Sequence, residues 1–183
     1  AASDVYKRQV LGVFGSSVVE ARVLSYVANC KSQLDIFSSG GDIYCDMAGV
    51  IYKEDPAFIR AQHKAGNTDY TYKRQMGKFV ILGSGYSMGG AGFQAQIAAQ
   101  AGITLSLDEA TGLINTYRNT YIEVPNFWNQ CNQVLKDMAA GGKGWFGGLD
   151  GKLFYYDGTI HIAGKRTPSI RLPDGLWLRY CEL

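Results

Sequence analysis

Four residues spaced at intervals of four could form one face of a nucleotide-binding helix. Arg74, Lys78, Leu82 and Tyr86 have this spacing, which on an α-helix stacks them along a slowly drifting face about 18 Å long. The planar guanidinium of arginine and the ammonium of lysine both bind phosphate oxygens. An aromatic ring at the far end can contact a base or a sugar. The pattern therefore indicates binding of a nucleoside triphosphate, although a solvated basic helix face has the same spacing.

The helix that carries this face is expected to run from Tyr70 to Gly83. Its opposite, apolar face is expected to pack inward through Met76, Phe79, Val80 and Gly83. Gly77 costs about 1 kcal/mol of helix stability relative to alanine, so its presence predicts close backbone packing. The glycine-rich GSGYSMGG that ends the helix follows no strand and lacks the GxGxxG spacing, which argues against a dinucleotide-binding turn.

Helices are predicted on both sides of this element. An apolar strand over Val10–Phe14 precedes a helix that begins near Glu20. Asp42 is expected to cap a second helix, and residues 54–69 are expected to form a connecting loop with at most one short helix. Further helices are predicted at 93–101, at 106–120 behind the capping box of Ser106 and Glu109, and at 126–138 after an interruption at Val124-Pro125.

The last part of the chain is expected to be β-structure. Residues 141–151 are expected to form a flexible connector, and four short strands are predicted over Leu153–Tyr156, Thr159–Ala163, Ser169–Leu172 and Leu176–Cys181. The predicted fold class is therefore α+β. Trp128, Trp145 and Trp177 are expected to serve packing or an interface rather than base stacking.

Composition restricts the function only weakly. The chain has 183 residues, 46% of them hydrophobic, with 18 basic and 16 acidic residues, so one domain with a real core is expected. The four cysteines form no CxxC pair. This spacing does not match that of known zinc sites and favours free thiols in the cytoplasm. No apolar run approaches the length of about 20 residues that spans a membrane.

The first nine residues, AASDVYKRQ, are treated separately. Their DVYKRQ portion resembles the translation of a sequencing-library adapter, and they have neither the apolar core of a signal peptide nor a helical pattern. Residues 1–9 are therefore interpreted as an artefactual leader, and residues 10–183 as the protein proper. On this interpretation the chain is expected to be an internal piece of a longer protein.

The string RQMGKFVILGSGYSMGGAGF resembles motif B of family A DNA polymerases in their bacteriophage form, R-x-x-x-K-x-x-x-[aromatic or Leu]-G-x-x-Y. The segment SSVVEARVLSYVANCKSQLDIFSSGGDIYCDMAGVIY is similar to motif A and the helices that follow it. YRNTYIEVPNFWNQ and the β-region ending in RLPDGLWLRY also resemble the phage enzymes, so the likeness covers nearly all of residues 10–183 in the right order. It implies a mostly helical fingers subdomain with part of an antiparallel palm sheet.

The resemblance also implies a role for each matching residue. Arg74 and Lys78 would hold the incoming triphosphate and act in catalysis. Leu82 would pack beside the sugar and base, and Tyr86 would lie by the templating base. Glu20 matches the glutamate that, together with the tyrosine, excludes a ribose 2′-hydroxyl. Arg22 is the sixth residue of the predicted site. It matches the arginine that closes motif A and would serve only for positioning.

One part of the family pattern is missing. Motif A of the family begins with an aspartate that bridges two Mg²⁺ ions, and the matching position is Gly15. The backbone carbonyl of Ser16 cannot replace that carboxylate, because Mg²⁺ requires several oxygen ligands. The second metal-binding aspartate belongs to motif C, which the family places beyond Leu183. Mg²⁺ is thus expected as the cofactor of the full-length enzyme, with its ligands absent from this chain.

The resemblance predicts a DNA-directed DNA polymerase that transfers deoxynucleotides to a primer 3′-hydroxyl and releases pyrophosphate. This chain alone is expected to be inactive. Its expected partners are primer-template DNA and deoxynucleoside triphosphates in a host cytoplasm, with replisome partners and any exonuclease domain left open. The alternatives are a polymerase-like module that binds nucleotide or primer-template without chemistry, and an unrelated α+β domain whose basic stripe is only a solvated face.

Overall fold

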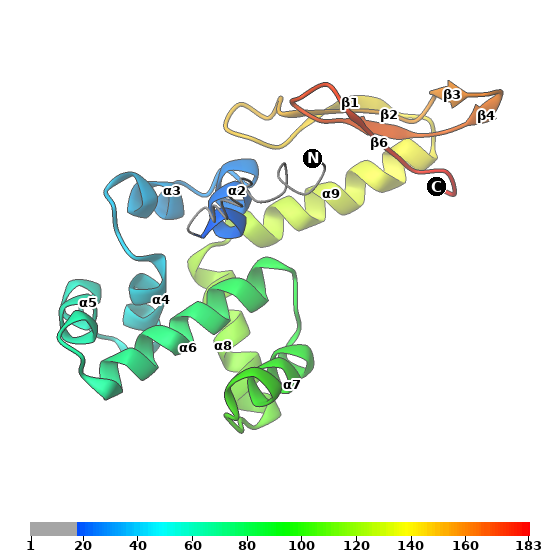
Figure 1. Ribbon diagram of the computed structural model, residues 1–183. Helices are drawn as coiled ribbons and strands as arrows, with labels where there is room; N and C mark the ends of the chain where they lie inside the picture. Colours follow the sequence, from blue (N-terminus) through cyan, green and yellow to red (C-terminus); the bar gives the residue numbers. More distant parts are fainter. Residues whose placement is uncertain (1–17) are drawn as a thin grey trace, which may run out of the picture.

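The computed structural model describes residues 18–183, and the predicted strand over Val10–Phe14 and the positions Gly15 and Ser16 lie outside them. The described residues form eight helices, a four-stranded antiparallel sheet and a two-stranded hairpin (Figure 1). The predicted α+β class is therefore confirmed. The helices are α2 (Val19–Val27), α3 (Lys31–Ser38), α4 (Ile43–Tyr52), α5 (Pro56–Lys64), α6 (Thr68–Gly85), α7 (Gly90–Ala101), α8 (Leu107–Thr120) and α9 (Glu123–Ala139).

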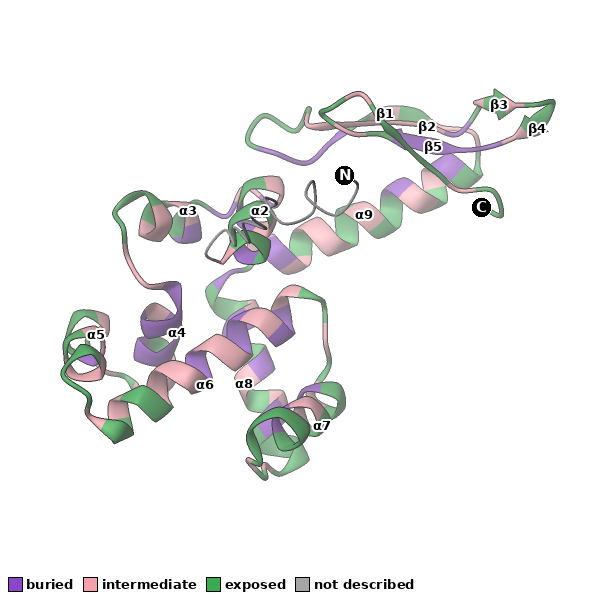
Figure 2. Ribbon diagram, viewed as in Figure 1, coloured by how far each residue is buried: buried purple, intermediate pink, exposed green. Residues whose placement is uncertain are grey.

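The main core lies among α2, α4, α6, α7 and α8, and its apolar side chains are the buried stripes of amphipathic helices (Figure 2). The helix α6 is central to this part of the molecule, because it packs against α2, α4, α5 and α8. The predicted inward face of α6 is confirmed: Met76, Val80 and Gly83 are buried, and Phe79 packs against the same core.

Gly77 is the point of closest approach between α4 and α6. A Cβ atom on Gly77 would overlap the carbonyl oxygen of Tyr44 and would lie 3.0 Å from the amide nitrogen of Ala48. Both of these atoms belong to the backbone of α4, so a side chain on Gly77 would push the two helices apart. The close backbone packing predicted from this glycine is therefore confirmed.

Side-chain caps fix where several helices begin. The carboxylate of Asp42 accepts hydrogen bonds from the amides of Tyr44 and Cys45 at the start of α4. Ser106 and Glu109 form the predicted capping box at the start of α8. Each cap satisfies backbone N–H groups that have no partner within the helix. Both caps occur where the sequence predicts them.

The sheet has the strand order β1-β2-β5-β6 and is antiparallel throughout. It lies along the C-terminal half of α9 (Figure 1). A second core fills the space between them and contains Val134, Met138, Phe146 and Ile170. The strands are β1 (Lys143–Phe146), β2 (Phe154–Asp157), β3 (His161–Ile162), β4 (Lys165–Arg166), β5 (Ser169–Arg171) and β6 (Trp177–Arg179).

The short helix allowed for within residues 54–69 is α5, whose N-cap is Asp55. Two other sequence-based predictions differ from the structure. The predicted flexible connector at 141–151 contains β1, which pairs with β2 along its whole length. The helix predicted from Asn126 begins at Glu123, because Pro125 falls in the first turn, where the missing N–H of proline has no helical partner to lose.

None of the helices among the described residues is long and apolar enough to cross a lipid bilayer.

Candidate functional site on helix α6

The predicted row of residues begins within α6 and ends just beyond it. Arg74, Lys78 and Leu82 are half-buried on the helix. Tyr86 is the C-cap residue and is 71% exposed, because the helix ends at Gly85. The helix α6 therefore positions two cations and one aliphatic side chain, and the residue that caps it carries the aromatic ring.

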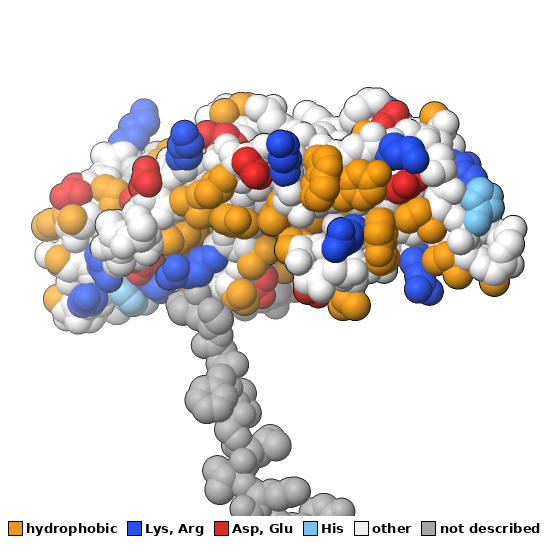
Figure 3. All heavy atoms as spheres, turned by 90° about the horizontal axis from the view of Figure 1, so that it is seen from above, with side chains coloured by type: hydrophobic (Ala, Val, Ile, Leu, Met, Phe, Trp, Pro, Cys, Tyr) orange, Lys and Arg blue, Asp and Glu red, His pale blue; other side chains and the backbone are white. Residues whose placement is uncertain are grey.

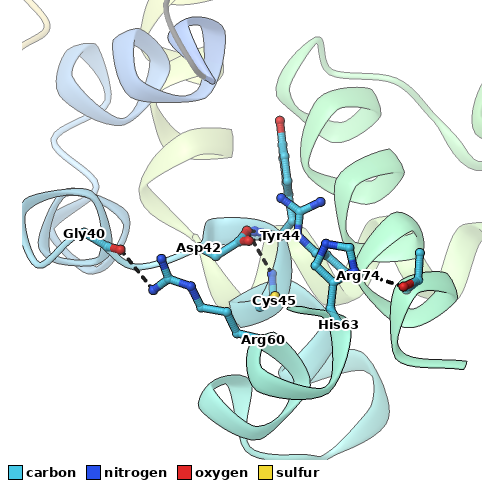
Figure 4. A network of polar contacts seen from close by, with 8 residues as sticks. Gly40, Asp42, Tyr44, Cys45, Arg60, His63 and Arg74 are labelled. Carbon is cyan, nitrogen blue, oxygen red and sulfur yellow. Dashed lines mark hydrogen bonds and ion pairs between the residues drawn. The ribbon is translucent and has the colours of Figure 1, made fainter. Parts of the chain in front are cut away.

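Arg74 is held in place by α4. Its Nε donates a hydrogen bond of 2.8 Å to Oδ2 of Asp42, and its guanidinium carbon lies 5.2 Å from the centre of the Tyr44 ring. Figure 4 shows the guanidinium beside Tyr44 of α4 and near Asp42, the N-cap residue of the same helix. The thiol of Cys45 is a further neighbour of the guanidinium. Arg74 is thus oriented through Nε by Asp42, while the remaining N–H groups of its guanidinium can still bind an anion.

The electrostatics of Asp42 reflect this pairing. Burial by itself raises the pKa of Asp42, but the hydrogen bond and charge of Arg74, together with the amides of Tyr44 and Cys45, outweigh it and hold the pKa below the ordinary 3.8. The carboxylate form is therefore favoured in the folded protein. Its contribution to stability is present above pH 3.8 and is lost as the pH falls through the lowered pKa.

Replacing Asp42 by Asn tests this pairing, because asparagine keeps the N-cap hydrogen bonds of α4 but loses the charge. The Asp42→Asn variant is expected to unfold with a free energy lower by about 1 kcal/mol at about pH 7. At about pH 3 the difference should shrink, since below pH 3.8 the unfolded chain takes up a proton at Asp42 and the advantage of the folded carboxylate decreases. Urea unfolding at both pH values measures it. A difference independent of pH would contradict a charged contact between Asp42 and Arg74.

Lys78 lies one turn beyond Arg74 on the same helix. Its ammonium has no ion pair and no hydrogen bond among residues 18–183. In contrast, Lys73 on the neighbouring face of α6 is paired with Glu54 and lies over the ring of Tyr70. Lys78 is thus the cation of this helix whose charge is uncompensated by the described protein.

A groove of about 430 Å³ runs between α2 and the C-terminal half of α6. Glu20, Leu82 and Tyr86 all line it, so the fold brings together three residues that the sequence placed in one site. Most of the remaining wall is apolar and consists of Val19, Ala21, Val23, Leu24, Val27, Ile81, Gly85 and Tyr117. The groove therefore offers one carboxylate and one exposed ring at the edge of an otherwise apolar surface.

Arg22 does not join the groove. It lies on α2, and its guanidinium carbon is 4.5 Å from the centre of the Phe37 ring of α3. This contact connects α2 to α3, so the geometry places Arg22 beside the candidate site rather than in it.

Sequence reasoning missed three residues of the site. Asp42 was recognised as a helix cap, but its ion pair with Arg74 joins positions 32 residues apart, and no local pattern signals such a contact. The same holds for Tyr44, which lies under the guanidinium, and for Tyr117, which closes the groove from α8.

The described residues do not fit a magnesium centre. Among residues 18–183, no three His, Cys, Asp or Glu side chains gather closely enough to hold a metal ion. The carboxylate beside Arg74, that of Asp42, is already engaged by Arg74 and by two backbone amides. Since Mg²⁺ needs several oxygen ligands, no chemical step of this chain is assigned to a metal.

Comparison of the chain with models of known protein families finds no match, and comparison with curated proteins finds none either.

Proposed function

We propose that this chain is the nucleotide-binding part of a DNA polymerase of the family A type, with α6 as the helix that binds the incoming deoxynucleoside triphosphate. The observation that carries the proposal is the joint placement of five residues. Arg74 and Lys78 present cations from one helix, and Leu82, Tyr86 and Glu20 line the groove at its other end. Phosphate contacts at one end and an apolar, ring-edged groove at the other match the two halves of a nucleotide.

The phosphate end rests on the two cations of α6. The charge of Lys78 is uncompensated by the described protein. Arg74 has further N–H groups for an anion, while Asp42 and Tyr44 fix its orientation. An oriented guanidinium loses less freedom on binding a phosphate than a mobile one does. The two cations therefore suit a triphosphate better than the mobile cations of a general anion-binding surface would.

The nucleoside end rests on the groove. Lys78 and Tyr86 are eight residues apart, which corresponds to about 12 Å along a helix, and this matches the reach from a triphosphate to the base of the same nucleotide. Leu82 would then contact the sugar and the base. Glu20, on the facing helix α2, would lie with Tyr86 at the sugar edge and disfavour a 2′-hydroxyl.

In this proposal the helices α2 to α9 belong to a fingers-like region and the sheet belongs to part of a palm. The reaction of the full enzyme would be attack of a primer 3′-hydroxyl on the α-phosphorus with release of pyrophosphate. The described residues supply binding and orientation for this step but no metal-binding carboxylate cluster. The chain by itself is therefore expected to bind nucleotide without extending a primer, and template-directed extension by the isolated chain would contradict this expectation.

The second candidate is a polymerase-like module that binds nucleotide or primer-template and has no chemistry in any context. The observation that favours it is Gly15 at the position where the family has its first metal-binding aspartate. Carboxylates at both metal positions of the parent gene would decide for the enzyme, and their absence would decide for the module.

Nucleotide binding is tested by titrating the chain into fluorescently labelled dATP and following the anisotropy. The proposal predicts saturable binding that unlabelled dATP reverses, that ATP reverses less effectively because of its 2′-hydroxyl, and that deoxyadenosine reverses poorly because it lacks phosphates. If deoxyadenosine competes as well as dATP does, the cations of α6 contribute nothing to binding, and the proposal is wrong.

A further inference from the structure

One face of the sheet carries a row of large side chains that crosses all four strands. In the strand register Trp145 lies opposite Tyr155, Tyr155 opposite Arg171, and Arg171 opposite Trp177. Alternate residues of a strand point to opposite faces. The neighbours of this row, among them Phe146 and Ile170, pack into the core against α9. The row of Trp145, Tyr155, Arg171 and Trp177 therefore lies on the outer face of the sheet.

The aromatic rings of this row form a continuous patch. The ring centres of Trp145 and Tyr155 are 5.1 Å apart, and those of Tyr155 and Trp177 are 6.5 Å apart. Trp145 is 53% exposed and Trp177 is 38% exposed, so of the two roles expected for these indoles, packing or an interface, their exposure favours an interface. Figure 3 shows hydrophobic side chains interspersed with basic ones on this side of the molecule.

The charges around the aromatic rings are mostly positive. Arg171 stands within the row, and Lys143 and Arg179 lie two residues along β1 and β6, on the same face. The acidic residue of this face, Asp157, accepts hydrogen bonds from Thr159, and its other oxygen lies 3.7 Å from Lys143. Arg171 and Arg179 are exposed and have no ion pair among the described residues.

We infer that the outer face of the sheet binds a single-stranded nucleic acid. Unpaired bases stack on exposed aromatic rings, and neighbouring arginines bind the phosphates between them. A duplex keeps its bases stacked inside and would use only the arginines, which leaves the two exposed indoles unexplained. A protein partner would have to bring carboxylates to Arg171 and Arg179, whereas every nucleotide carries its own negative charge.

This surface is separate from the site on α6. The sheet packs against α9, whereas α6 packs against α2, α4, α5 and α8. The inference therefore goes beyond the proposed function and does not depend on it. The two proposals can fail separately. A chain with only the nucleotide site would bind dATP but no strand, and a chain with only the strand-binding sheet would bind a strand but no dATP.

The test measures anisotropy of fluorescein-labelled oligothymidine and oligouridine of about twenty nucleotides with the whole chain and its variants. Trp145→Ala and Trp177→Ala should each weaken binding roughly 5- to 100-fold, since one stacking contact is lost. Trp177→Phe should restore most of the affinity. Arg171→Ala should reduce the slope of log affinity against log salt by about 0.7, the loss of one phosphate contact on a single strand.

Matched controls separate this surface from general effects. Leu176→Ala removes an exposed side chain next to Trp177 but outside the row, and Lys31→Ala removes an exposed charge on α3; both should leave strand affinity unchanged. Lys78→Ala should also leave it unchanged. Stronger binding of one strand type would identify DNA or RNA as the ligand. The inference is overturned if the unaltered chain binds neither strand, or if the Trp145→Ala/Trp177→Ala double variant binds as well as the unaltered chain.

Discussion

Replacing Gly77 by Ala is expected to lower the free energy of unfolding by about 3 kcal/mol, because the new methyl group meets the backbone of a neighbouring helix. The Cβ atom would overlap the carbonyl oxygen of Tyr44 and would lie 3.2 Å from the carbonyl carbon of the same residue. Backbone atoms in the middle of a packed core cannot rotate away as a flexible side chain can. The helices α4 and α6 would therefore separate, and thermal or urea unfolding measures the loss.

Gly112→Ala is the matched control for this substitution. Gly112 also lies within a helix, α8, but a Cβ atom there would meet nothing within 4 Å. Alanine should therefore stabilise this position by up to about 1 kcal/mol through its higher helix propensity. If Gly77→Ala were as well tolerated as Gly112→Ala, the close contact of α4 and α6, on which the position of Arg74 depends, would be wrong.

Replacing Lys78 by Ala is expected to weaken dATP binding by roughly 10- to 100-fold, which is the loss of a charged contact to phosphate. The reason is that Lys78 has no partner among the described residues, so its charge remains for a ligand. Stability should change little, because no ion pair is broken. Titration of labelled dATP, with urea unfolding in parallel, measures both quantities.

Lys73→Ala is the control for Lys78→Ala, because it removes the same charge from the same helix. Lys73 is paired with Glu54 and lies over the ring of Tyr70, so it is turned away from the proposed nucleotide. Its replacement should leave the dATP affinity almost unchanged. Equal losses from the two variants would mean that α6 attracts nucleotides only by its overall charge, without a defined site.

Local signals in the sequence predicted much of the helical part. The amphipathic pattern of α6, the cap at Asp42 and the capping box of Ser106 and Glu109 depend on residues within a few positions of each other. Gly77 also gave a correct prediction, because a glycine in a helix interior needs a packing reason. These features follow from helix geometry and need no knowledge of the rest of the chain.

Contacts between distant residues could not be predicted in the same way. The glycine-rich segment 141–151 predicts a connector, yet the pairing of β1 with β2 makes part of it a strand. The sequence predicts Arg74 as a phosphate-binding residue, but it does not indicate the contacts of Arg74 with Asp42 and Tyr44. The outer aromatic row becomes visible only when the register aligns Trp145, Tyr155 and Trp177 from three strands.

The most direct test of the site is photo-crosslinking with 8-azido-dATP followed by proteolysis and mass spectrometry. The proposal places the base at the C-terminal end of α6, so the label should attach at or near Tyr86, in the tryptic peptide that begins at Phe79 and ends at Arg118. An excess of dATP should abolish this labelling, and Lys78→Ala should reduce it. Labelling that excess dATP fails to suppress, or that falls on the sheet or on α5 instead, would contradict a nucleotide site on α6.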